Sequence, residues 1–90
     1  MHNAIWGDMM YWRIRDLRED RDLTQQKVAD YLHCSQRAYS HYERGDADIP
    51  TSVLIQLAIL YNTSTDYLLG VTDDFTPPKR KKREEGQVHG

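Results

Sequence analysis

The chain has 90 residues, a mass of 10.6 kDa and a formal net charge of -2, which suits one small domain and excludes a large enzyme core. Hydrophobic residues make up 39% of the chain and charged residues 29%, so a folded domain is expected rather than a disordered chain. The longest apolar run, residues 53–60, is interrupted by Gln56 and is far below the roughly 18 to 20 residues that a membrane span needs. The chain shows no export signal and Cys34 has no second cysteine to pair with, so a cytoplasmic protein is expected.

The charge is distributed unevenly along the chain. Residues 1–76 carry a net charge of -5, whereas residues 77–90 carry +3 because of the basic run 79–83. Nonspecific affinity for nucleic acids comes mostly from Lys and Arg side chains that contact phosphates. An acidic folded part therefore suits DNA binding only if its positive charges are grouped on one face.

The first predicted helix spans about residues 11–21. Its apolar face includes Ile14 and Leu17 at helical spacing, and its opposite, polar face begins with Arg13. No Gly or Pro interrupts this segment, which agrees with a continuous helix.

Three further helices are marked by residues that favour a helix start. Thr24 and Ser35 stand where N-cap residues belong, and Pro50 suits a first helical turn. Gly45 can adopt the left-handed conformation that ends a helix. These signals predict helices over residues 25–32, 36–44 and 50–61, followed by a short one over 64–69 for which Ser64 is the expected cap.

The predicted fold class is all-α, a compact five-helix domain over residues 11–70. Residues 1–10 form an N-terminal extension, and residues 71–90 are expected to be a flexible basic tail because they show no apolar periodicity. The core is expected to contain Leu17, Val28, Ala29, Leu32, Tyr39, Tyr42, Leu54, Leu57, Ala58 and Leu68.

The second and third predicted helices are separated by a three-residue turn, an arrangement typical of a helix-turn-helix. Ala29 is small enough to stand where the two helices cross closely. The turn position that favours glycine holds His33, which tolerates positive φ at a cost of about 1 kcal/mol.

At these residues the sequence resembles the phage-repressor and Cro-like helix-turn-helix family, also called the xenobiotic response element family. Residues 14–25 resemble the family's first helix and the entry to its second, residues 35–45 its recognition helix, and residues 55–58 with 64–70 its last two helices. The resemblance implies a lambda-repressor-like fold. It also implies sequence-specific binding of double-stranded DNA by a small bacterial or phage-encoded transcriptional regulator, expected to be a repressor.

The resemblance further implies roles for individual residues. The third helix would lie in the major groove and read base edges with Gln36, Arg37, Ser40 and His41. Phosphates would be held by Gln25, Gln26, Lys27, Tyr39 and Arg44. Arg18 would pair with Glu43 to stabilise the fold. The acidic residues expected to lie mostly away from this face are Asp16, Glu19, Asp20, Asp66, Asp73 and Asp74.

One recognition helix covers only a few base pairs, so a homodimer on an operator with two-fold related half-sites is expected. Its candidate contacts are the cluster around Trp6 and Trp12 and the apolar surface of Ile59 and Leu60. The alternative function is that of an antitoxin, or another module whose main partner is a protein such as a toxin. Whether the basic run 79–83 is a solvated tail or contacts DNA stays open.

No enzyme, cofactor or metal site is predicted. The chain has only five glycines and no phosphate-cradling glycine loop, and no Ser-His-Asp set is recognisable. The histidines are scattered, and Cys34 has no neighbouring His or Cys at the spacing of a metal site.

Overall fold

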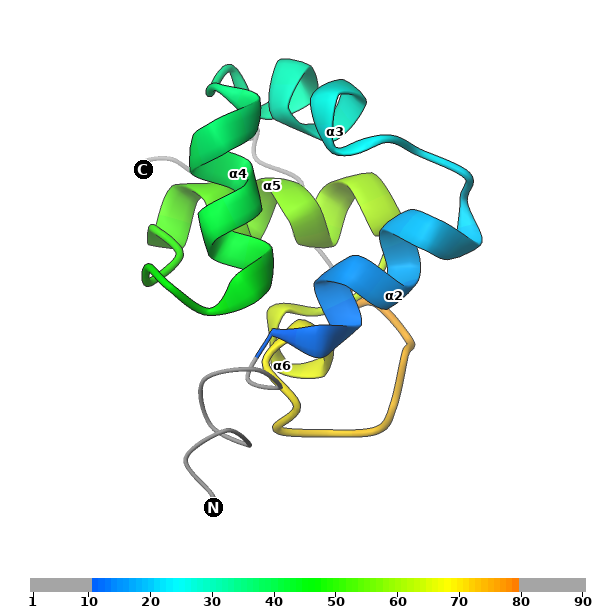
Figure 1. Cartoon of the computed structure of the whole chain (residues 1–90). Coiled ribbons are helices and arrows are strands. Elements are labelled where there is room, and N and C mark those ends of the chain that lie inside the picture. Colours follow the sequence, from blue (N-terminus) through cyan, green and yellow to red (C-terminus); the bar gives the residue numbers. More distant parts are fainter. Residues whose placement is uncertain (1–10, 80–90) are drawn as a thin grey trace, which may run out of the picture.

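The computed structural model describes residues 11–79, and within that range it contains five α-helices and no strand. The helices are α2 (Trp12–Asp20), α3 (Gln25–Leu32), α4 (Gln36–Arg44), α5 (Thr51–Tyr61) and α6 (Thr65–Leu68) (Figure 1). Helix α4 packs on α3 and α2, and α6 packs on α5 and α2. The predicted all-α five-helix fold is confirmed, with helix bounds within one residue of those expected.

Side chains cap three of the helices as the sequence predicts. The hydroxyl of Thr24 accepts a hydrogen bond from the Lys27 N–H at 3.0 Å, and the hydroxyl of Ser35 accepts one from the Ala38 N–H at 3.0 Å. Ser64 caps α6 in the same way. Pro50 differs from the prediction, because its extended backbone places it immediately before α5 and not within the first turn. These contacts fix where each helix begins.

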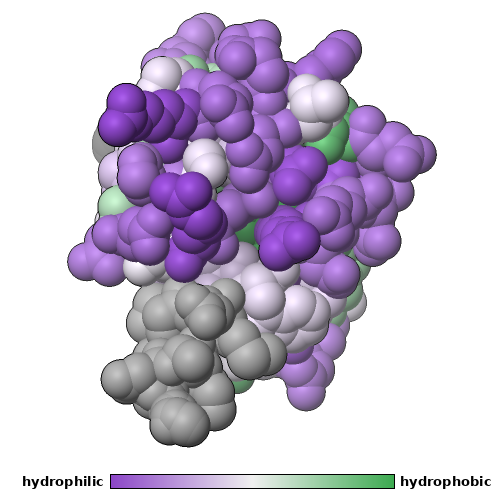
Figure 2. All heavy atoms as spheres, in the orientation of Figure 1, coloured by the Kyte–Doolittle hydropathy of each residue, from purple (hydrophilic) through white to green (hydrophobic). Residues whose placement is uncertain are grey.

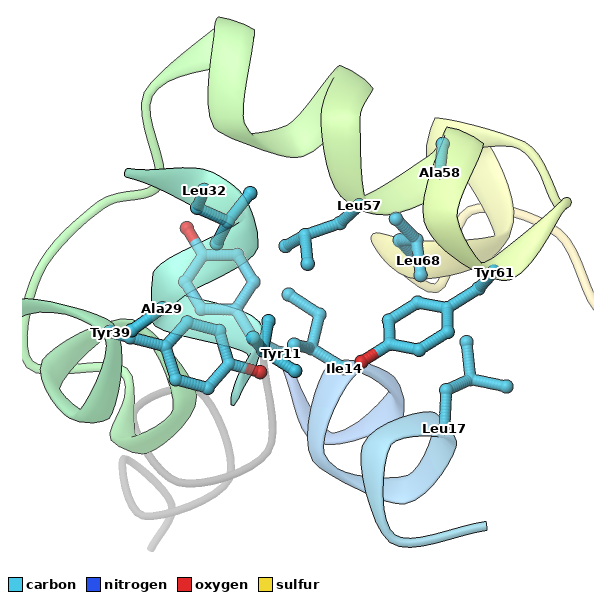
Figure 3. Packing of buried hydrophobic residues seen from close by; sticks show 11 residues of the cluster. Tyr11, Ile14, Leu17, Ala29, Leu32, Tyr39, Leu57, Ala58, Tyr61 and Leu68 are labelled. Atoms are coloured by element: carbon cyan, nitrogen blue, oxygen red, sulfur yellow. The ribbon is translucent and has the colours of Figure 1, made fainter. Parts of the chain in front are cut away.

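Eleven buried residues from all five helices and the residue before α2 form one hydrophobic core (Figure 3). The core residues are Tyr11, Ile14, Leu17, Val28, Ala29, Leu32, Tyr39, Leu57, Ala58, Tyr61 and Leu68. Tyr42 and Leu54, which were expected inside, are only partly buried and pack against the edge of this cluster. No helix in the part of the chain that the structure describes is long and apolar enough to cross a membrane.

Arg13 differs most from its predicted position. The helical period assigns it to the polar face of the first helix, yet it is only 8% exposed. Its guanidinium lies 4.1 Å from the ring centroid of Tyr67 and donates hydrogen bonds to the carbonyl oxygens of Tyr67 and Thr72. It also pairs with the carboxylate of Asp73. Arg13 is therefore buried by the chain that follows α6.

This following segment, residues 71–79, is called the C-terminal strap below. The Thr63 hydroxyl donates a hydrogen bond to the Phe75 carbonyl oxygen at 2.6 Å, and the Phe75 ring meets Tyr67 edge to face at 5.1 Å. The strap was expected to belong to a flexible tail, and these contacts join its residues 72, 73 and 75 to α2, to α6 and to the turn before α6. The remaining tail residues, 80–90, and the N-terminal extension with Trp6 lie outside the described residues.

Tyr61 provides a test of the core. Its side chain is fully buried, and its hydroxyl has no hydrogen-bond partner among the described residues. Burial raises the pKa of this phenol to about 12. A buried hydroxyl without a partner destabilises the fold by about 1 to 3 kcal/mol. We expect Tyr61→Phe to keep or increase the free energy of unfolding, measured by urea denaturation.

Tyr39→Phe is the matched control, because it removes the same atom from an equally buried ring whose hydroxyl does have a partner. The Tyr39 hydroxyl donates to Glu43 at 2.6 Å. This variant is expected to lose about 1 to 3 kcal/mol. Equal losses in the two variants would contradict the assignment of Tyr61.

Candidate nucleic-acid interface

The turn between α3 and α4 fixes the relative placement of the two helices. His33 adopts the left-handed conformation with φ of 60°, as predicted for this position. The Cys34 N–H then donates to the Ala29 carbonyl oxygen at 3.0 Å, which closes the end of α3. Ala29 itself is completely buried. A small residue and a left-handed turn thus allow α4 to pack closely against α3.

Helix α4 has one inward and one outward side. Tyr39 and Glu43 point inward and are buried. Gln36, Arg37 and Arg44 are exposed, and Ser40 and His41 are half-buried. The face of the molecule that carries α4 is mainly hydrophilic (Figure 2). The four predicted base readers therefore share the part of α4 that the core does not use.

Glu43 is the centre of a buried hydrogen-bond network beneath this face. Its carboxylate accepts from Arg18 Nε at 2.6 Å and Nη2 at 3.1 Å, from the Tyr39 hydroxyl, and from Gln25 Nε2 at 3.1 Å. Burial alone would raise the pKa of Glu43, but the hydrogen bonds from Arg18, Tyr39 and Gln25 outweigh it and lower the pKa. The pair between Arg18 and Glu43 that the resemblance implied is present. The network joins α2, α3 and α4.

Gln25 extends this network to the surface. Its Oε1 accepts a hydrogen bond from Gln36 Nε2 at 2.6 Å. A predicted phosphate holder at the start of α3 and a predicted base reader at the start of α4 are thus bonded to each other. Glu43 orients Gln25, and Gln25 in turn orients Gln36.

Tyr39 must be removed from the predicted phosphate contacts. Its side chain is completely buried and its hydroxyl donates to Glu43, so it cannot reach a phosphate. Burial also raises the pKa of Tyr39, so the hydroxyl keeps the proton that it donates. Gln26 and Lys27 are exposed on the first turn of α3, and Gln26 Nε2 donates to Asp30 at 2.8 Å.

A hollow opens beside α4, between α2, the start of α3 and the loop after α4. Its lining residues are Arg15, Arg18, Glu19, Gln25, Ser40, Glu43, Arg44 and Asp46. Glu19 was expected away from this face, but it lies here because it pairs with Arg15 one helical turn earlier on α2. The hollow therefore contains acidic as well as basic groups.

Asp46 is the residue that the sequence reasoning missed. Its Oδ2 accepts a hydrogen bond from Arg44 Nε at 2.9 Å and lies 3.4 Å from His41 Nδ1. The sequence feature that could have indicated this contact is Gly45. Its left-handed backbone turns the chain so that the Asp46 N–H donates to the His41 carbonyl oxygen. Among residues 11–79, no group of three or more His, Cys, Asp or Glu side chains is placed to hold a metal ion.

Comparison with known proteins identifies the family. The helix-turn-helix family model matches residues 14–68, which is more than half of the chain. The uncharacterized HTH-type transcriptional regulator YobD of Bacillus subtilis is 37% identical over 70 residues, covering 78% of this chain and 62% of that protein. The HTH-type transcriptional regulator ImmR of the same organism is 41% identical over 58 residues, covering 64% of this chain and 46% of that protein.

A third relative, the SPbeta prophage-derived uncharacterized regulator YonR of Bacillus subtilis, is 33% identical over 57 residues, covering 63% of this chain and 53% of that protein. The chain thus spans about half to three fifths of the length of these relatives. No solved structure matches it significantly. The five helices, the α3–α4 turn and the family match together show that the chain belongs to the Cro and phage-repressor type of the helix-turn-helix family.

Proposed function

We propose that the protein binds double-stranded DNA as a transcriptional regulator and places α4 in the major groove. The observation that carries the proposal is the outward side of α4, where Gln36, Arg37, Ser40 and His41 stand free of the core. Glutamine can bond adenine bidentately and arginine can bond guanine bidentately. The side chains that discriminate bases are therefore grouped on one side of one helix.

The groups beneath α4 support this role. Helix α4 is fixed by the Glu43 network, and a base-reading helix needs such fixed support because small misplacements abolish bidentate bonds. The exposed first turn of α3 offers the positive end of the helix dipole to a phosphate. Gln25, Gln26, Lys27 and Arg44 are the phosphate-holding residues of the proposal.

A homodimer on two-fold related half-sites completes the proposal, with repression by occupancy of an operator. On α5, Ile55 and Ile59 are 44% and 51% exposed and one helical turn apart, so this surface is one candidate contact, beside Trp12, which is 44% exposed. Leu60 is partly buried against the core and so contributes less than expected. The relatives named above are transcriptional regulators and do not favour a toxin as the main partner.

Two single substitutions distinguish a residue that reads bases from a residue that holds a phosphate. Arg37→Ala should weaken binding to the selected operator by about 1 to 3 kcal/mol and relax preference at particular positions. Arg44→Ala should weaken binding to all duplexes alike and reduce the log-log salt slope by about one unit. The measurement is a salt series on a duplex selected from random DNA and on its scrambled version.

Arg37→Lys is the matched control, because it keeps the charge and removes the bidentate fork. It should retain nonspecific affinity and lose preference for the bases that Arg37 reads. Gln36→Ala tests the neighbouring reader in the same way. If the Gln36 and Arg37 variants bind both duplexes like the parent protein, α4 does not read bases.

A further inference from the structure

The cationic side chains at the end of α4 are already occupied within the protein. Arg44 Nε donates to Asp46 Oδ2 at 2.9 Å, and Arg44 Nη2 lies 3.2 Å from His41 Nδ1. The side chains of Arg44 and Asp46 are 58% and 51% exposed. The cluster therefore lies at the surface, on the side that the proposed function turns to DNA.

The position of Asp46 is set by the backbone and not by the side chains alone. The left-handed Gly45 ends α4, and the Asp46 N–H donates to the His41 carbonyl oxygen at 3.0 Å. Hydrogen bonds from Arg44 and then His41 lower the pKa of the Asp46 carboxyl. A carboxylate is thus held, ionised at neutral pH, two residues beyond the end of α4.

His41 is part of the same cluster in either tautomer. Its Nδ1 can accept from Arg44 or donate to Asp46, but it cannot do both at once. In both cases a predicted base reader and a predicted phosphate holder are bonded within the protein. A DNA phosphate that approaches Arg44 meets the negative charge of Asp46 at the same place.

We propose that Asp46 is an intramolecular competitor for Arg44, so that it lowers the affinity of the protein for all DNA without changing base preference. This inference rests on the proposed DNA-binding function. A phosphate must displace the Asp46 carboxylate to bond Arg44. This exchange is less favourable in free energy than binding to an unpaired guanidinium would be. The penalty applies to operator and random sequence alike, because Asp46 competes for a phosphate contact and not for a base.

Asp46→Asn tests this inference, with Asp48→Asn as the matched control. Both substitutions remove one negative charge from the loop after α4. Of these two side chains, only that of Asp46 pairs with a cation within residues 11–79. Asp46→Asn should tighten binding to the selected and the scrambled duplex by about two- to fivefold. Its log-log salt slope should steepen by a fraction of one unit, because Arg44 no longer divides its charge between Asp46 and a phosphate. Asp48→Asn should leave the slope unchanged.

The double variant Arg44→Ala with Asp46→Asn identifies the partner. Relative to Arg44→Ala alone, it should gain no more affinity than Asp48→Asn gains over the parent protein. Equal behaviour of Asp46→Asn and Asp48→Asn, weaker binding by Asp46→Asn, or a gain that persists without Arg44 would each overturn the inference while leaving DNA binding established. If the parent protein selects no duplex from random DNA, the proposed function itself fails. Thermal melts check that each variant is folded.

Discussion

Glu43→Ala is expected to lower the free energy of unfolding by about 3 to 5 kcal/mol, because it leaves a nearly buried charge without its partner. The side chain of Arg18 is 13% exposed and that of Glu43 is 3% exposed. The Tyr39 hydroxyl also loses its acceptor inside the core. Since domains of this kind are stable by only about 5 to 15 kcal/mol, the variant should be marginally folded at 25 °C. Urea denaturation measures the loss.

Glu19→Ala is the matched control for this prediction. Glu19 pairs with Arg15 at 3.2 Å, where both side chains are more than half exposed, and approaches Arg18 only at 3.9 Å, so its removal should change stability by less than about 1 kcal/mol. A loss in Glu43→Ala no greater than that of Glu19→Ala would show that the network does not hold α2, α3 and α4 together.

The pH dependence of unfolding provides a second measurement on Glu43. Its pKa in the folded protein is lowered from the ordinary value of 4.5, so the unfolded chain binds a proton more readily. The stabilisation is therefore fully present above 4.5 and is lost as the pH falls through the lower, folded value. In Glu43→Gln this part of the acid sensitivity should be absent, while stability at neutral pH is reduced.

The helices and their ends could be predicted because they depend on residues close in sequence. Thr24 and Ser35 each accept a hydrogen bond from an N–H three residues later, so the motif that causes the cap is readable in the chain. Gly45 and His33 end their helices in the left-handed conformation for the same local reason. The resemblance then supplied the spatial order of these helices.

Arg13 was misplaced because its surroundings come from distant segments, whereas Tyr39 was misplaced because its hydroxyl is bonded to Glu43, four residues later on the same helix. The C-terminal strap lies some sixty positions from Arg13 in sequence, and helical periodicity contains no information on what will cover the polar side of a helix. The tyrosine spacing correctly predicts that Tyr39 is buried, but not that Glu43 lies within the core to accept its hydroxyl. Buried charges are rare enough that a sequence pattern does not predict them unaided.

The residues of the candidate site likewise divide into those that could be predicted from the sequence and those that could not. The outward residues of α4 follow from helical spacing once Tyr39 is placed inside. Glu19 and Asp46 do not, because each has more than one cationic group close to it in sequence, and spacing alone does not say which one it pairs with. The net negative charge of residues 1–76 agrees with this arrangement. Carboxylates lie among the arginines that line the hollow beside α4, and not only on other faces of the domain.

Ala29→Glu is expected to unfold the domain. Ala29 is completely buried on α3, which packs on α4, so a longer side chain has no space there. Overpacking alone costs about 1 to 3 kcal/mol, and a buried carboxylate without a partner adds several more. The sum approaches the whole stability of a small domain. The measurement is the helical circular dichroism signal as a function of temperature.

Two further variants separate the causes of this loss. Gln26→Glu adds the same negative charge at an exposed position of the same helix, so its melting temperature should stay close to that of the parent protein. Ala29→Leu adds volume without charge and should lose about 1 to 3 kcal/mol, because α3 and α4 must move apart. If Ala29→Glu melted like the parent protein, α3 and α4 could not cross as closely as the buried Ala29 indicates. The orientation of α4, on which base reading depends, would then have to be set by contacts other than the close crossing with α3.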